Sequence, residues 1–214
     1  GVALAQNALT PELLKDLRAS FVKDAPTKAV MNAVSANSAK ALVQDRETVL
    51  GVNQHFSHRI KTEGITDQKS SGRCWLFAGL NILRPTAMTA LNKKGFEFSQ
   101  TYLFFYDKLE KANLFLEAMI ELRKKPLDDP DVTWLLKNSL PDGGQWNMVL
   151  ALIDKYGAVP SDVMPETESS SNTGLMNALI SSVLHRHTVA LRAMDAQGKS
   201  EAELRAAKTA MLRD

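Results

Sequence analysis

A polar loop that runs directly into an apolar segment is the feature that most constrains the fold of this sequence. The loop, Gln68 to Cys74, holds the single cysteine of the 214 residues. An apolar run from Trp75 to Leu83 follows and predicts a buried helix that begins at Cys74. Unpaired N–H groups and the macrodipole at a helix N-terminus stabilise an anion. We therefore predict a thiol that readily forms the nucleophilic thiolate.

Gln68 is the second candidate for chemistry in this loop. It lies six residues before Cys74 and carries an amide that can donate hydrogen bonds. If the loop folds back, this amide and the Cys74 N–H flank one oxyanion. The alternative for a lone cysteine is a small buried hydrophobe without chemistry. The polar, glycine-containing approach to Cys74 favours the reactive interpretation.

Three segments resemble a known family. They are Gln68–Trp75 (QKSSGRCW), Phe98–Lys108 (FSQTYLFFYDK) and Asp142–Trp146 (DGGQW). They are similar to the bleomycin hydrolase or aminopeptidase C family of papain-like cysteine peptidases, strongly over residues 50 to 165. The related signature has a cysteine where this chain has Ser71, and secreted members use that cysteine in a disulfide. Its replacement suits a reducing compartment, so we expect a cytoplasmic protein.

The resemblance implies an α+β papain-like fold. The part present here is expected to be mostly α-helical, built around a central helix that starts at Cys74, because the β-rich half comes from later sequence. We predict an N-terminal helical segment (1–50), the nucleophile-bearing half of the catalytic domain (51–165) and the start of a helical insertion (166–214). The last of these is predicted to be truncated.

The resemblance also implies an activity, namely hydrolysis of N-terminal peptide bonds, and of bleomycin, through an acyl-enzyme on Cys74. Gln68 is the second predicted catalytic residue. Gly143 and Gly144 align with the glycine pair that holds the substrate main chain, and Trp75 and Asp142 complete the predicted substrate-binding set. Peptide substrates and a homohexamer are the implied partners. Neither a metal nor a cofactor is expected.

None of the four histidines of the chain is assigned as the base that this chemistry needs. His55 and His58 precede Cys74, whereas the papain-like order places the catalytic histidine after it. His187 shares an apolar helical face, and His185 points to another side of the same helix, so the two are not expected to chelate a metal. The catalytic histidine and its orienting asparagine are therefore expected beyond residue 214, and the 214-residue chain alone is predicted to be inactive.

Local signals predict several further elements. Thr10, Ser99 and Ser200 are predicted helix N-caps, the last in a capping box with Glu203. Residues 52–60 are predicted to form a short strand, and residues 166–172 a polar loop. A helix is predicted over 145–156, closed by Gly157.

Two predictions concern the buried and exposed faces of helices. The helix that begins at Cys74 is apolar nearly all round and is predicted to be buried, with a kink near Pro85. Asp107 and Lys111 are predicted to pair on the outer face of a helix whose apolar stripe includes Tyr102 and Met119.

Composition leaves two other functions open. One is a redox or regulatory protein with a single reactive thiol, and the other is a nucleic-acid-binding module. The net charge of +2 is too small to predict nucleic-acid or membrane binding. No apolar run approaches the roughly 20 residues that span a bilayer.

Overall fold

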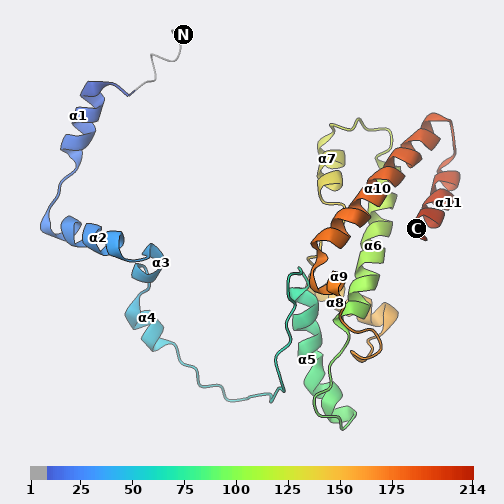
Figure 1. Cartoon of the computed structure of the whole chain (residues 1–214), viewed down its shortest axis with the longest axis horizontal. Coiled ribbons are helices and arrows are strands. Elements are labelled where there is room, and N and C mark those ends of the chain that lie inside the picture. Colours follow the sequence, from blue (N-terminus) through green and yellow to red (C-terminus); the bar gives the residue numbers. More distant parts are fainter. Residues whose placement is uncertain (1–8) are drawn as a thin grey trace. The chain divides into compact units, whose positions relative to one another are not determined.

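The computed structural model describes residues 9–214, which form eleven helices (Figure 1). The chain divides into two compact units, Gly1–Arg59 and Ile60–Asp214. The predicted catalytic and insertion segments, 51–165 and 166–214, thus fall largely within one unit. The predicted division of the chain into segments 1–50, 51–165 and 166–214 stays a prediction.

Unit 1 is a series of short helices without a core. Its helices are α1 (Pro11–Ser20), α2 (Ala25–Ala36), α3 (Ala39–Leu42) and α4 (Arg46–Gly51). Thr10 caps α1 as predicted, because its side chain accepts a hydrogen bond from the N–H of Leu13. No side chain in residues 9–59 is buried, so the apolar stripe of α1 is exposed.

The predicted strand over residues 52–60 is wrong. These residues are irregular, and none pairs with another segment in the described structure. A strand needs a neighbour to satisfy its backbone groups, and the local residue pattern supplies none.

Unit 2 is built from helices joined by ordered loops. Its helices are α5 (Cys74–Ala90), α6 (Gln100–Glu121), α7 (Pro130–Lys137), α8 (Trp146–Tyr156), α9 (Glu168–Ser171), α10 (Thr173–Ala196) and α11 (Glu201–Met211). Helix α6 packs against α5, α8, α10 and α11, whereas α5 packs against α6 and α8. The helix that begins at Cys74 therefore shares the centre of this unit with α6. Within residues 9–214, β-structure is limited to two isolated bridges.

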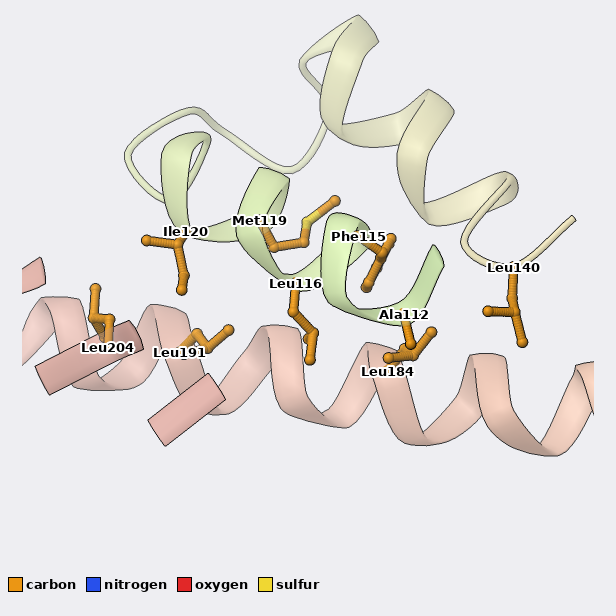
Figure 2. Packing of buried hydrophobic residues seen from close by; sticks show 9 residues of the cluster. All are labelled: Ala112, Phe115, Leu116, Met119, Ile120, Leu140, Leu184, Leu191 and Leu204. Carbon is orange, nitrogen blue, oxygen red and sulfur yellow. The ribbon is translucent and has the colours of Figure 1, made fainter. Parts of the chain in front are cut away.

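Two apolar clusters hold unit 2 together. The larger joins α6 to α10 and α11, and Figure 2 shows its members: Ala112, Phe115, Leu116, Met119, Ile120, Leu140, Leu184, Leu191 and Leu204. The second joins α5, α6 and α8, and its members are Trp75, Leu76, Leu80, Leu103, Phe104, Val149 and Leu152. Burial of these side chains is the main force that fixes the start of α5 against α6 and α8.

Helix α5 is buried only in its first half. Its buried residues lie between Trp75 and Leu80, whereas Ile82 is 64% exposed. The prediction of burial along the whole helix is therefore wrong for its second half, because α6 and α8 cover only the half next to Cys74. The helix continues through Pro85 to Ala90.

Other local predictions are confirmed. Ser99 caps α6 by accepting a hydrogen bond from the N–H of Tyr102, and Ser200 forms a reciprocal capping box with Glu203. Gly157 ends α8 with φ of 74°, a conformation that favours glycine. None of the helices in residues 9–214 combines the length and hydropathy needed to cross a bilayer.

Candidate active site

Cys74 is the first residue of α5, as predicted, and its side chain is exposed. Arg73 occupies the N-cap position but forms no side-chain capping bond, so it does not cover the first N–H groups of the helix. The thiol thus lies at a helix terminus whose unpaired N–H groups carry a partial positive charge. The residues that follow it are buried and hold this terminus in place.

The amide of Gln68 is turned toward its own loop. Its Nε2 donates to the carbonyl of Ser71 at 2.5 Å, and the hydroxyl of Ser71 donates back to the carbonyl of Gln68 at 2.6 Å. Between them, Lys69 has φ of 54°, a left-handed conformation that is costly for a residue other than glycine. A primary amide has two N–H groups, and Ser71 uses one of them. The role of Gln68 toward an oxyanion stays a prediction.

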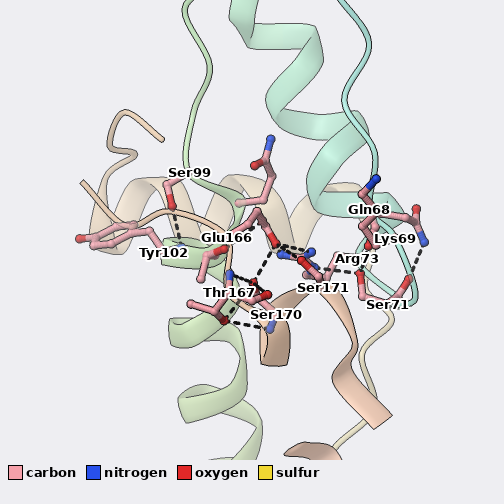
Figure 3. Close-up of polar contacts among 12 residues, drawn as sticks. Gln68, Lys69, Ser71, Arg73, Ser99, Tyr102, Glu166, Thr167, Ser170 and Ser171 are labelled. Atoms are coloured by element: carbon pink, nitrogen blue, oxygen red, sulfur yellow. Dashed lines mark hydrogen bonds and ion pairs between the residues drawn. The ribbon is translucent and has the colours of Figure 1, made fainter. Parts of the chain in front are cut away.

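Arg73, next to Cys74, is completely buried and forms a two-pronged ion pair with Glu166 (Figure 3). Its Nη1 and Nη2 donate to the two carboxylate oxygens of Glu166, each at 2.8 Å. Thr101 and Ser170 donate to the same carboxylate at 2.9 and 2.8 Å. Burial alone would raise the pKa of Glu166, but these hydrogen bonds outweigh burial and lower it. Glu166 is therefore an anion that neutralises the buried guanidinium.

Asp142 anchors the same loop from the other side. Its Oδ2 accepts from the backbone N–H of Gly72 at 3.0 Å and from Thr173 Oγ1 at 2.5 Å. Its Oδ1 accepts from Lys108 Nζ at 2.6 Å and from Asn177 Nδ2 at 2.7 Å. Burial alone would raise the pKa of Asp142, but the four donors lower it well below its usual range. This carboxylate is occupied by donors from the chain itself, so it supports the loop; its predicted contact with substrate stays untested.

Lys108 and Lys111 of α6 both bind the loop that carries Asp142. Lys111 Nζ donates to Asp107 at 2.6 Å and to the carbonyl of Gly143 at 2.8 Å. The predicted Asp107–Lys111 pair is therefore present, but its predicted place on the outer face is wrong, since Asp107 is only 2% exposed. Burial raises the pKa of Asp107 and lowers the pKa of Lys108. The pair lies under a loop from a distant part of the sequence, which the helical pattern alone does not reveal.

The two glycines of the predicted substrate-binding set differ in their surroundings. A Cβ on Gly144 would lie 2.5 Å from the indole ring of Trp75, whereas a Cβ on Gly143 would meet no atom within 4 Å. The indole Nε1 donates to the carbonyl of Asp142 at 2.9 Å. Gly144 therefore allows the contact with Trp75, and Gly143 leaves an open backbone face beside it.

The two histidines of α10, His185 and His187, contact residues outside the nucleophile loop (Gln68–Cys74). His185 Nε2 lies 3.0 Å from the carbonyl of Leu136. His187 is largely buried, with its Nε2 3.6 Å from a carboxylate oxygen of Asp214. Within residues 9–214, no three His, Cys, Asp or Glu side chains gather as metal ligands.

Sequence reasoning missed the partners that hold the loop. Residues 166–172 were predicted to be a polar loop, but they contain α9, capped by Thr167 in a capping box, and Ser170 is buried. The signal present in the sequence was a threonine three residues before Ser170. Nothing local indicates that Glu166 pairs with a residue 93 positions earlier.

An exposed cysteine at the first position of a half-buried helix is the arrangement expected for a nucleophilic thiol. The chain belongs to the Peptidase C1-like family, a family of papain-like cysteine peptidases, whose sequence model matches residues 8–214. It is similar to aminopeptidase C of Lactobacillus delbrueckii subsp. lactis, with 38% identity over 94% of this chain and 45% of the relative. It is also similar to bleomycin hydrolase of Gallus gallus, with 38% identity over 86% of this chain and 41% of the relative.

A solved structure shares the fold. The crystal structure of PepW from Lactobacillus rhamnosis HN001 superposes with a TM-score of 0.85 at 38% identity, over 97% of this chain and 47% of that one. The chain thus spans about half the length of these relatives.

Proposed function

We propose that this chain carries the nucleophile-bearing part of a cysteine aminopeptidase. The observation that carries the proposal is the exposed Cys74 at the first position of α5, on a loop held by buried ion pairs. The relatives named aminopeptidase C and bleomycin hydrolase support the same reaction class. The substrate is a peptide with a free N-terminus and, by resemblance, bleomycin.

In the proposed reaction, the Cys74 thiolate attacks the carbonyl carbon of the first peptide bond. The N–H of Cys74 and the amide of Gln68 stabilise the oxyanion, for which the Gln68 amide turns from Ser71 toward the substrate. The amine leaves with a proton, and water then hydrolyses the acyl-enzyme to release the N-terminal residue and the thiolate. The open backbone face of Gly143 is the proposed place for the substrate main chain.

A histidine must take the thiol proton and later protonate the leaving amine. His185 and His187 contact Leu136 and Asp214 instead. We propose that the catalytic histidine and its orienting asparagine come from the part of the longer relatives that this chain does not span. The full-length protein is further proposed to be a homohexamer, which light scattering on the purified protein would test. It is also proposed to be cytoplasmic, which cell fractionation would test.

The test compares the 214-residue chain with the product of the full reading frame. We expect the full-length protein to hydrolyse aminoacyl coumarin amides and Cys74→Ala to abolish this activity. The 214-residue chain should be alkylated at Cys74 by iodoacetamide yet show no turnover. Turnover that survives Cys74→Ala, or turnover by the 214-residue chain that requires His187, would refute the proposal.

A further inference from the structure

Residues 166–177 hold the nucleophile loop at three points, although they follow Cys74 by more than 90 residues. The first point is the backbone of Ser70. Its N–H donates to the carbonyl of Ser171 at 2.9 Å, and its carbonyl accepts from the N–H of Thr173 at 3.3 Å. These two bonds form an isolated parallel bridge between the loop and the start of α10.

The second point is the buried ion pair between Arg73 and Glu166, which Figure 3 shows beside the loop. The guanidinium also stacks over the rings of Phe77 and Phe104, at 5.1 and 5.4 Å from their centroids. Because Arg73 immediately precedes Cys74, this pair fixes the residue at which α5 begins.

The third point is Asp142, which connects the loop to α10. Thr173 and Asn177, one turn apart on α10, both donate to its carboxylate, and that carboxylate accepts the N–H of Gly72. Thr173 is buried, and its hydroxyl shares the Oδ2 atom with Gly72. Removal of the Thr173 hydroxyl would therefore loosen the acceptor that fixes the loop.

We propose that Glu166, Thr173 and Asn177 are positioning residues for Cys74, acting through Arg73 and Asp142. The inference rests on the proposed function insofar as Cys74 is the nucleophile. It adds that the first turn of α10 is part of the support of the active site. Helix α10 is in turn fixed to α6 by the larger apolar cluster, so the packing of α10 sets the position of the loop.

The experiment uses the 214-residue chain and the substitution Thr173→Val, which keeps the side-chain shape and removes the hydroxyl. Amide hydrogen exchange, followed by mass spectrometry of peptides that cover Gln68–Leu76, reports on the loop directly. We expect the Gly72 amide to exchange about tenfold faster, the factor expected for loss of one hydrogen bond to a charged group. Alkylation of Cys74 by iodoacetamide at pH 7 should slow, because a looser loop holds the thiol less firmly at the N-terminus of α5, which favours the nucleophilic thiolate. A gain in access does not offset this effect, because the thiol is already exposed.

Two variants separate positioning from general stability. Thr173→Ser keeps the hydroxyl and should restore both wild-type rates. Thr188→Val is the matched control, because Thr188 is also buried on α10 but its hydroxyl donates only to the carbonyl of Leu184 in its own helix. It should leave both rates unchanged.

Wild-type exchange and alkylation in Thr173→Val, or equal changes in Thr188→Val, would overturn the inference. Failure of Thr173→Ser to restore the rates would also overturn it. These readouts need no peptidase turnover, so they stand or fall separately from the proposed activity.

Discussion

The ion pair between Arg73 and Glu166 is asymmetric, and its two partners should differ in their effect on stability. Arg73 is completely buried, whereas the Glu166 side chain is 38% exposed. Glu166→Gln leaves a buried guanidinium without a counter-charge, which costs about 3–5 kcal/mol of unfolding free energy. The amide oxygen of Gln still accepts one hydrogen bond, so we expect about 3 kcal/mol.

Arg73→Met should cost less, about 1–2 kcal/mol, because the remaining Glu166 carboxylate can be hydrated from its exposed side. The methionine side chain would also pack against the rings of Phe77 and Phe104, on which the guanidinium now stacks. The double variant should be no less stable than Arg73→Met alone.

Urea unfolding followed by circular dichroism and tryptophan fluorescence measures these free energies. Glu121→Gln is the control, because Glu121 pairs with Arg205 on the surface, where both side chains are largely exposed, and such surface pairs contribute less than about 1 kcal/mol. If Arg73→Met proves as costly as Glu166→Gln, the buried charge does not dominate the energetics of the pair and the reasoning fails.

Two further predictions follow from the loop. Gly144→Ala should displace Trp75 and destabilise the fold by about 1–3 kcal/mol, whereas Gly143→Ala should fold normally and raise KM in the full-length enzyme; similar stability losses for both would contradict this. The pKa of Glu166 and that of Asp142 are lowered in the folded state, so the stability they add is complete above their ordinary values near pH 4 and is lost as the pH falls further. Burial raises the pKa of Asp107, so this group adds stability as the pH falls and opposes the effect of Glu166 and Asp142. The measurement is therefore the difference in urea midpoint between wild type and Glu166→Gln, followed from pH 7 to pH 2.5. This difference should shrink in acid.

Sequence reasoning succeeded where the deciding interactions are local. The Ser99 cap and the Ser200 capping box depend on residues within four positions of each other. The start of α5 at Cys74 was predicted from the local change from a polar loop to an apolar run. The sequence also singled out two segments that the structure brings together, since Trp75, next to Cys74, lies against Gly144 and donates to the carbonyl of Asp142.

The long-range pairs that hold the candidate site in place could not be predicted from local sequence patterns. Asp142 accepts from Gly72 across 70 positions, and Arg73 pairs with Glu166 across 93. Such pairings depend on the packing of α6 and α10, which a local pattern does not contain. For the same reason, the buried pair of Asp107 and Lys111 was predicted to be a surface pair.

The lack of a core in unit 1 determines what an unfolding experiment on this chain reports. The urea dependence of the unfolding free energy scales with the surface that unfolding exposes. Residues 9–59 contain no buried side chain, so they add little to that surface. The helices of residues 9–59 by themselves therefore add little to the urea dependence or to the heat capacity of unfolding, whereas residues 60–214 by themselves should respond to denaturant like a protein of about 155 residues.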